Sequence, residues 1–405
     1  MAQTADVVVI GSGGFGSSVA YAVARRRKAV ILLDRHAIAS QTSPRAAGLA
    51  STIRSTDLMT TLATIAADMF VQFQEETGQP MGVVRAGSIK VARTPEDAAL
   101  LVGDAARGER LRLGTTPISA GEAHERHPLL QPDGIVAALH VPTDIYFEPG
   151  QAALSFAMAA AARGATLMPH NPVTAIRRVA GRVVGVDTPG GPIDAAVVVD
   201  AAGAWAQGIA ELAGYRIPLA PMRHQLLITE PLPGVHAMLP MIRIIDAAVY
   251  VRPSWGGLLV GGYEDAPTHI DMNTVPAGFQ VTDVPLDVAV LRGLIAKVAR
   301  QLPILVDAPI RVHRGGVPTL TVDGQHIVGE VPGAEGMFVA AGCNVSGLSI
   351  SPVIGELLAE WIVQGRPSID LSPMAITRFG AEWDDDARVR AAADRHYASF
   401  YRATI

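Results

Sequence analysis

The stretch ADVVVIGSGGFGSSVAYAVARRRKAVILLDRH, residues 5–36, decides the fold of this chain. Val7 to Ile10 has the length and β-branched composition of a buried parallel strand. A glycine-rich turn follows, then an alanine- and valine-rich segment that predicts a helix up to Arg25, then a second apolar run at 29–33. This order of strand, turn, helix and strand predicts the βαβ unit of a Rossmann-like fold.

Six residues form the turn after the first strand: Gly11, Ser12, Gly13, Gly14, Phe15 and Gly16. Gly11 permits a tight turn, Gly13 lets the backbone approach a pyrophosphate, and Gly16 lets the helix pack against the strand. Unpaired N–H groups at the start of the helix favour bound phosphates. Asp34 ends the second strand about twenty residues later, where a carboxylate accepts ribose hydroxyls, and Arg35 follows it. The turn predicts an adenine dinucleotide site, with NAD and FAD both open.

The composition sets the class of protein. The chain has 405 residues, of which 49% are hydrophobic and 18% charged, as in a globular protein with a large core. A net charge of −5 argues against nucleic-acid binding. No apolar run reaches the roughly twenty residues that span a bilayer, and a strand so near the start predicts no signal peptide. The single cysteine, Cys343, excludes an internal disulfide, and we expect a cytoplasmic protein.

Two later segments repeat the pattern of a strand, small residues and a helix. They are AAVVVDAAGAWA, residues 195–206, and GMFVAAGCNVSGLSISPVIGELLAEWI, residues 336–362. NAD enzymes usually hold the cofactor within one continuous unit, whereas an FAD domain split around a substrate domain has such returning segments. The pattern favours FAD.

The expected fold is α/β, with a discontinuous Rossmann-like FAD-binding domain and a substrate domain of antiparallel β-sheet plus helices. We expect the FAD-binding domain to comprise residues 1–80, 148–222 and 310–378. The substrate-binding domain then comprises residues 81–147 and 223–309, and residues 379–405 form a C-terminal tail.

Four stretches together resemble one family of proteins. They are VVVIGSGGFGSSVAYAVARRR (7–27), SQTSPRAAGLASTIR (40–54), HQLLITEPLP…LPMIRIIDAAVYVRPSWGGLLVGGYE (224–264) and TVDGQHIVGEVPGAEGMFVAAGCNVSGLSISPVIGELLAEWI (321–362). Residues 5–378 resemble the D-amino acid oxidase-like FAD-dependent oxidoreductases, and specifically their sarcosine and dimethylglycine dehydrogenase branch. The resemblance implies FAD, oxidation of a C–N bond, and an FAD domain assembled from three separated segments.

The resemblance assigns further FAD contacts to residues outside the first turn. They are Ser43, Arg45, Ala46, Ala47, Gly48, Val173, Ala202, Gly203, Trp205, Gly342, Asn344, Val345, Ser346, Gly347 and Leu348. Arg45 stands where covalently flavinylated relatives have the linking histidine, and no cysteine lies where the sarcosine oxidases attach flavin. We therefore expect non-covalent FAD. We also expect no folate-binding region, into which the larger members of the branch continue.

Three residues are candidates for the catalytic site. His224 and Tyr250 match an active-site histidine and tyrosine of dimethylglycine-oxidising relatives. On strands facing each other over the flavin they would orient an amine and accept or relay its proton. Arg54 matches an arginine that binds the substrate carboxylate, a role that suits a guanidinium. The alternative is that His224 and Tyr250 are ordinary residues of a sheet and that Arg54 is a surface arginine.

Two further positions depart from the related oxidases. Ser349 replaces a lysine that completes the carboxylate site, so Arg243 or Arg252 would have to substitute, although strand arginines usually face solvent. Val260 stands where the oxidases place a lysine that promotes reaction with oxygen. The absence of that lysine favours a dehydrogenase.

We expect an FAD-dependent amine oxidoreductase that acts on a secondary or tertiary N-alkyl amino acid or a cyclic amine. Oxygen, a quinone or a partner protein would accept the electrons, and both a homo- and a hetero-oligomer stay open. The alternatives are oxidation of a 2-hydroxy acid or a D-amino acid, an FAD-carrying subunit of a larger complex, and an NAD enzyme. The scattered His124, His127 and His140 lack metal-ligand spacing, which predicts no metal site.

Overall fold

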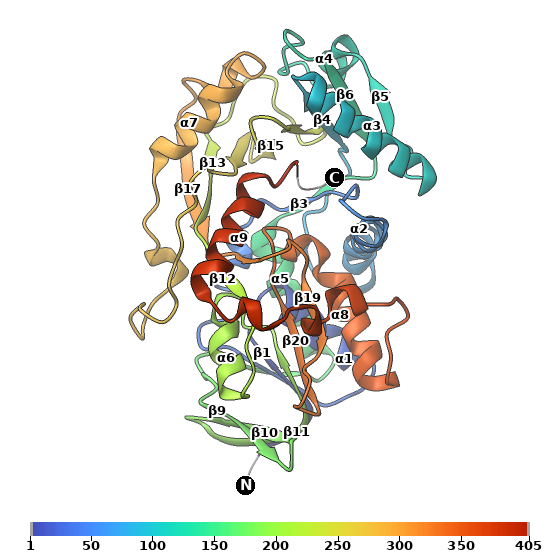
Figure 1. Cartoon of the computed structure of the whole chain (residues 1–405). Helices are drawn as coiled ribbons and strands as arrows, with labels where there is room; N and C mark the ends of the chain where they lie inside the picture. Colours follow the sequence, from blue (N-terminus) through green and yellow to red (C-terminus); the bar gives the residue numbers. More distant parts are fainter. Residues whose placement is uncertain (1–2, 403–405) are drawn as a thin grey trace.

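The first strand of the chain lies inside an eight-stranded sheet (Figure 1). The computed structural model describes residues 3–402, and this sheet has the order β19-β20-β11-β1-β2-β8, with β10 and β9 attached to β11. Its strands are β1 (Gln3–Ile10), β2 (Val30–Leu33), β8 (Thr166–Met168), β9 (Ala175–Val179), β10 (Arg182–Thr188), β11 (Gly191–Asp200), β19 (Ile327–Glu330) and β20 (Met337–Ala341). Neighbours from β20 to β8 are parallel, as the predicted Rossmann-like α/β fold requires.

Helices cover both faces of this first sheet. They are α1 (Gly14–Arg25), α5 (Pro149–Ala162), α6 (Ala206–Leu212) and α8 (Gly347–Gln364). Val7 and Val9 pack into the core under α1, α5 and α8, whereas Val8 and Ile10 pack into the opposite core with α6. A strand buried on both faces is apolar at every position, which explains the continuous apolar run of β1.

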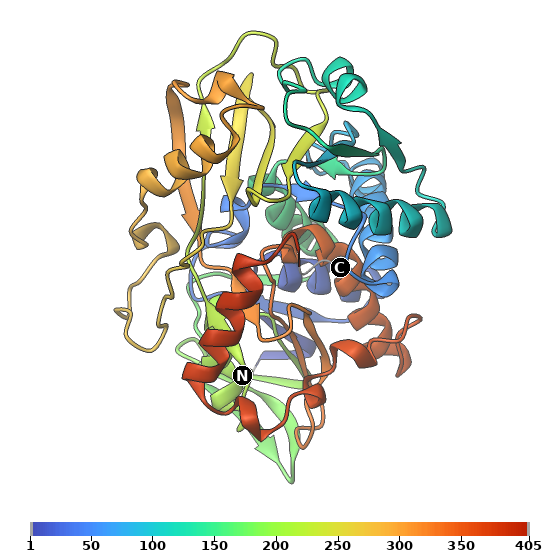
Figure 2. The same ribbon diagram turned by 45° about the horizontal axis from the view of Figure 1, so that its top comes forward.

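A second eight-stranded sheet lies beyond the first and is largely antiparallel (Figure 2). In spatial order its strands are β17 (Ile310–Gly316), β13 (His224–Thr229), β16 (Gly257–Gly262), β15 (Val249–Ser254), β14 (Met241–Ile244), β4 (Ser88–Ala92), β6 (Ala137–Val141) and β5 (Thr116–Ile118). Only the β14–β4 pair is parallel within this sheet of the described chain. It provides the predicted antiparallel sheet with helices.

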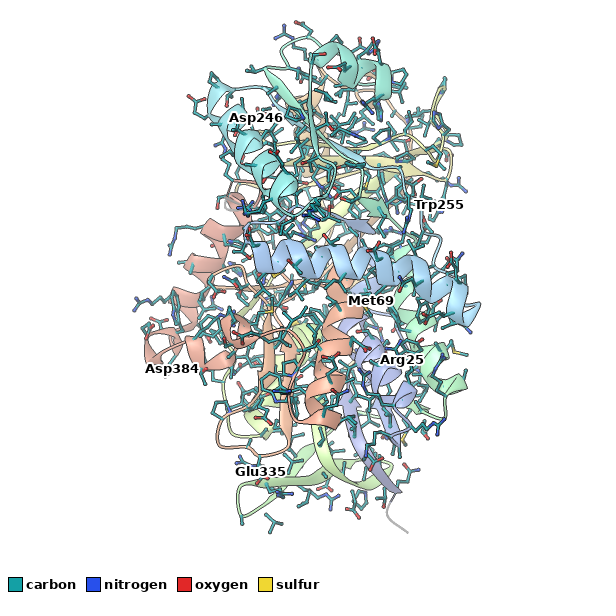
Figure 3. All side chains as sticks on the ribbon, turned by 90° about the vertical axis from the view of Figure 1, so that its right-hand side faces the viewer. Arg25, Met69, Asp246, Trp255, Glu335 and Asp384 are labelled. Carbon is teal, nitrogen blue, oxygen red and sulfur yellow. The ribbon has the colours of Figure 1, made fainter. Side chains whose placement is uncertain are left out.

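Three helices pack beside the second sheet: α3 (Pro95–Arg110), α4 (Ala120–Arg126) and α7 (Val288–Val298). The long helix α2 (Asp57–Thr77) lies between the two sheets. Figure 3 shows α2 crossing the molecule between the part that carries Asp246 and the part that carries Glu335. Two short pairs, β3 (Leu49–Ala50) with β7 (Ile145–Tyr146) and β12 (Leu219–Pro221) with β18 (Thr319–Thr321), complete the strands.

Two features bear on the expected division of the chain. Strand β17 begins at residue 310, in a segment expected to belong to the FAD-binding domain. It pairs with β13 and so forms part of the second sheet, which contains the strands of the expected substrate-binding domain. The expected C-terminal tail contains an ordered helix, α9 (Asp386–Ala398), which packs against β12 and β18. Residues 403–405 of that tail lie outside the described part of the chain.

Candidate functional site

A cavity of about 450 Å³ lies at the carboxyl ends of β1, β2 and β11. Its walls include predicted dinucleotide contacts that follow these three strands, together with two from other segments. They are Gly11, Ser12, Gly13, Asp34, Arg35, Ala202, Gly203 and Trp205, with Ser43 and Val173. Carboxyl ends of parallel strands meet at one edge of a sheet, which is where open α/β sheets bind ligands. The structure therefore brings these distant residues together around one space.

Three glycines shape the entrance to this cavity. Gly11 has a φ of +96°, and a Cβ there would lie 2.5 Å from the carbonyl oxygen of Ala201. A Cβ on Gly16 would lie 1.8 Å from the carbonyl oxygen of Gly11. At Gly13 the nearest atom to a Cβ is the Ser43 hydroxyl oxygen at 3.2 Å, so a side chain there would project into the cavity. The backbone of this turn is thus open to a pyrophosphate, as FAD requires.

The predicted ribose contact, Asp34, lies beside the glycine turn in the cavity wall. Asp34 accepts hydrogen bonds from the Ser12 N–H at 2.8 Å and from the His36 N–H at 2.8 Å. The Arg35 guanidinium lies 5.4 Å from the centre of the Trp205 ring, within cation–π distance. Asp34 is therefore fixed in place at the cavity wall, beside a flat aromatic surface.

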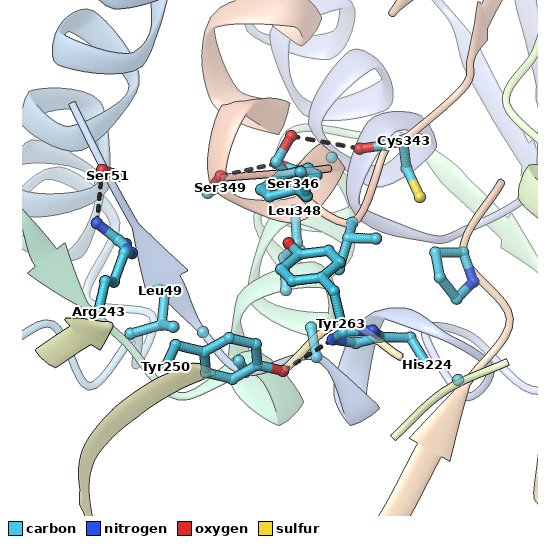
Figure 4. A pocket seen from close by; sticks show the side chains of 18 of the residues that line it. Leu49, Ser51, His224, Arg243, Tyr250, Tyr263, Cys343, Ser346, Leu348 and Ser349 are labelled. Carbon is cyan, nitrogen blue, oxygen red and sulfur yellow. Dashed lines mark hydrogen bonds between the residues drawn. The ribbon is translucent and has the colours of Figure 1, made fainter. Parts of the chain in front are cut away.

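A second cavity of about 160 Å³ lies where the two sheets approach each other (Figure 4). Thr42 and Ser43 line both cavities, so the two cavities adjoin. The predicted residues in the walls of the second are Ser43, Arg45, Ala46, Ala47, Gly48, Val345, Ser346, Gly347 and Leu348, together with Arg54, His224 and Tyr250. Two adjoining cavities, the first with a glycine turn, fit an elongated dinucleotide whose reactive ring lies near His224 and Tyr250.

Five predicted FAD contacts line neither of these two cavities: Gly14, Phe15, Gly16, Gly342 and Asn344. They support the walls instead. The Gly14 N–H donates to the Ser43 hydroxyl at 2.9 Å, and the Asn344 side chain accepts from the Thr321 N–H at 3.0 Å. Asn344 and Val345 have φ values of +45° and +57°, which strains a β-branched valine and is typical of functional sites.

His224 and Tyr250 form a direct hydrogen bond, with 2.8 Å between Nε2 and the phenol oxygen. The expectation of facing strands is wrong, because β13 and β15 lie in one sheet with β16 between them. Gly261 of β16 makes the contact possible, since a Cβ there would lie 2.3 Å from the Tyr250 oxygen. Burial lowers the pKa of His224 to about 4 and raises the pKa of Tyr250, so both side chains are uncharged at pH 7.

Arg54 is half-buried and not a surface arginine. Its guanidinium donates to the Ser51 carbonyl at 3.0 Å and to the Ser349 hydroxyl at 3.1 Å. Ser349, which replaces the lysine of the related oxidases, is thus a direct neighbour of Arg54. Burial, and then the nearby Arg243, lower the pKa of Arg54 to about 10, so the group remains charged at pH 7.

Sequence reasoning missed several residues of the second cavity, among them Leu49, Lys90, Phe400 and Tyr401. Arg243, which the sequence offered as a substitute for the missing lysine, lines this cavity. Arg243 and Arg252 are both buried and do not face solvent as strand arginines usually do. Arg243 donates to Asp144 at 3.0 Å and to the Ser51 hydroxyl at 2.7 Å. The signal was present in the apolar strand MIRI, where one charged residue among buried neighbours indicates a buried partner.

The structure also corrects the interpretation of Val260. Val260 packs with Leu291 and Leu294 of α7, whereas its neighbour Leu259 packs with Tyr250 on the cavity side of the sheet. Successive strand residues point to opposite faces, so a lysine at position 260 would point away from the cavity. Position 260 therefore does not distinguish a dehydrogenase from an oxidase.

Residues 3–402 lack two other kinds of feature. Within that range, no helix combines the length and the low polarity needed to cross a bilayer. The same residues include no cluster of three or more histidine, cysteine, aspartate or glutamate side chains arranged to hold a metal ion.

Comparison with known proteins gives a consistent result. The profile of the family described as "FAD dependent oxidoreductase" matches residues 6–361. The human mitochondrial sarcosine dehydrogenase is 31% identical over 98% of this chain and 44% of its own length. The mitochondrial pyruvate dehydrogenase phosphatase regulatory subunit of Mus musculus is 31% identical over 93% of this chain and 43% of its own length. The chain thus spans less than half the length of these curated relatives.

One solved structure combines similar fold and similar length. Glycine oxidase from Geobacillus kaustophilus superposes with a TM-score of 0.81 and 27% identity, and the match covers 94% of this chain and 100% of that one. The likeness therefore extends through both sheets and not only through the dinucleotide-binding turn.

Two glycine variants test the dinucleotide cavity. Gly13→Val should fold but lose FAD, because its side chain would occupy the cavity while touching little else. Gly16→Ala should lose stability as well as FAD, because its Cβ would collide with the Gly11 carbonyl. FAD absorbance per mole of purified protein and the thermal unfolding midpoint measure the two effects. A Gly13→Val protein with a full complement of FAD would place the pyrophosphate elsewhere.

Proposed function

Because the chain belongs to the FAD-dependent oxidoreductase family, we propose that it oxidises the C–N bond of an amino acid with a secondary or tertiary amine, or of a cyclic amine. The observation that carries this proposal is a single cavity with an uncharged His224–Tyr250 pair and buried cations in its walls. In Figure 4, His224 and Arg243 lie on different sides of that cavity. A small molecule with an amine and a carboxylate matches this arrangement.

The cations would bind the carboxylate. Lys90 pairs with Asp104 at 2.6 Å and Arg243 with Asp144 at 3.0 Å, whereas the guanidinium of Arg54 has hydrogen bonds to uncharged groups among the described residues. These five groups carry three positive and two negative charges. A substrate carboxylate would balance the excess and would gain charge-assisted hydrogen bonds.

The same charges would help to form the reactive amine. Bound FAD supplies the acceptor for two electrons and a hydrogen from the carbon next to nitrogen, and the resulting imine hydrolyses in water. This oxidation requires an uncharged amine. Positive charge in the cavity lowers the pKa of a bound ammonium, and His224 and Tyr250, both uncharged, add no carboxylate-like attraction for it. The Tyr250 hydroxyl is then a neutral group that orients the amine.

The non-covalent state of FAD belongs to the same proposal. Arg45 donates to the carbonyls of Ser40 and Gln41, both at 2.7 Å, and a guanidinium does not form the link made by histidine. Cys343 lines the second cavity, but burial raises the pKa of its thiol, which disfavours the nucleophilic thiolate.

Acid precipitation tests the attachment of FAD. We expect the yellow colour to stay in the supernatant, since neither Arg45 nor Cys343 offers a suitable nucleophile. Flavin fluorescence of the washed pellet measures what remains with the protein. Stoichiometric flavin in the pellet would show a covalent bond.

Variants of the uncharged pair test the reaction. His224→Ala and Tyr250→Phe should each slow anaerobic flavin reduction by an amine about a hundred- to ten-thousand-fold, while FAD stays bound. Tyr21→Phe is the matched control, because Tyr21 is buried in the first sheet's core and its hydroxyl has no hydrogen-bond partner among the described residues. Rates within about threefold of the unmodified protein in both test variants would return His224 and Tyr250 to ordinary packing roles.

A second candidate function follows from one relative. The regulatory subunit that is 31% identical to this chain is named for regulation and not for oxidation. An FAD-carrying subunit without its own substrate would retain the cofactor but would not be reduced by any amine. We place the protein in the cytoplasm, because a chain with a single cysteine does not depend on disulfides. The electron acceptor would be identified by the rate at which oxygen, a quinone or a partner protein reoxidises the reduced flavin.

A further inference from the structure

The C-terminal helix brings a third residue to the His224–Tyr250 pair. Tyr397 of α9, red in Figure 1, is fully buried, and its phenol oxygen lies 2.7 Å from His224 Nδ1. His224 Nε2 lies 2.8 Å from the Tyr250 oxygen. We propose that Tyr397 is a positioning residue that acts through His224, and that its hydroxyl sets the direction of the hydrogen bond between His224 and Tyr250. This inference rests on the proposed function of that pair.

Helix α9 holds Tyr397 against His224. The Asp385 side chain caps the start of the helix by accepting from the Ala387 N–H at 2.8 Å, and Asp394 joins the helix to His269 at 2.7 Å near its end. Tyr397 packs in one apolar cluster with Tyr250 and Leu226. A polar contact to His269 and the burial of its apolar face therefore hold the helix in place.

The hydrogen-bond inventory fixes the direction. Tyr397 is fully buried, and among the described residues His224 Nδ1 is the one acceptor within hydrogen-bond distance of its hydroxyl. A buried hydroxyl hydrogen without an acceptor is costly, so the Tyr397 hydroxyl donates to His224 Nδ1. A neutral imidazole carries one hydrogen, which must then be on Nε2. His224 donates to Tyr250.

The direction matters at the cavity. When Nε2–H donates to the Tyr250 oxygen, the hydroxyl hydrogen of Tyr250 is turned away from His224 and toward the cavity. Without the Tyr397 hydroxyl, the imidazole can reverse its hydrogen, and the Tyr250 hydroxyl can donate to Nε2 instead of to a substrate. Tyr263 follows β16, and its ring centre lies 5.2 Å from that of His224. Among the contacts described, it does not hydrogen-bond to either imidazole nitrogen, so it does not affect this direction.

A double-mutant cycle tests whether Tyr397 acts through His224. Tyr397→Phe should slow anaerobic flavin reduction by sarcosine about five- to tenfold, the rate equivalent of one lost hydrogen bond. The same change in a His224→Ala background should alter the rate by less than about twofold, because the residue it acts through is absent. Tyr21→Phe is again the matched control, since it removes a buried tyrosine hydroxyl without touching His224, and it should leave the rate unchanged.

Nitrogen NMR of the unmodified, FAD-bound protein with isotope-labelled histidine provides a readout that does not depend on turnover. The signal lost in His224→Gln should show hydrogen on Nε2. Hydrogen on Nδ1 would overturn the inference, and so would additive effects in the cycle or a Tyr397→Phe rate within about twofold of normal. If His224→Ala itself has no effect on the rate, the proposed function fails, which is a separate outcome.

Discussion

The close approach of the Gly16 backbone to the Gly11 carbonyl is the constraint on which the rest of the structure depends. The space available there excludes even a methyl group. It seats α1 directly on β1, leaves the turn open to a pyrophosphate, and fixes the edge of the sheet at which the strands from three chain segments end. Thr42 and Ser43 extend that edge into the second cavity, so the position of the reacting groups follows from the glycine turn.

The second cavity separates charge from neutral hydrogen-bonding groups. Burial holds His224 and Tyr250 uncharged, whereas Arg54 stays charged despite burial because its pKa falls only to about 10. Buried cations are costly unless they are paired, and Asp144 pairs with Arg243. The remaining positive charge both favours a carboxylate and disfavours an ammonium, so one electrostatic feature would serve binding and amine activation together.

Local spacing was enough to predict the βαβ unit, because Gly11, Gly13, Gly16 and Asp34 act within one short segment. The second cavity was harder to predict, because Lys90 lines it and Tyr397 contacts His224 from elements far apart in the chain, and neither residue carries a local motif. Val260 shows a different limit. An alignment one residue out of register moves a strand side chain to the opposite face, and only the paired strands of the structure reveal which face it occupies.

The most direct test of the central claim compares amino acids with the amines that remain when their carboxylate is removed. Sarcosine, dimethylglycine and proline would be mixed anaerobically with the FAD-bound protein, each beside its counterpart dimethylamine, trimethylamine or pyrrolidine, and the flavin absorbance followed. The account predicts that at least one of the amino acids bleaches the flavin and that its counterpart does so far more slowly. Flavin that no member of the panel reduces, or that an amine reduces as fast as its amino acid, would contradict it.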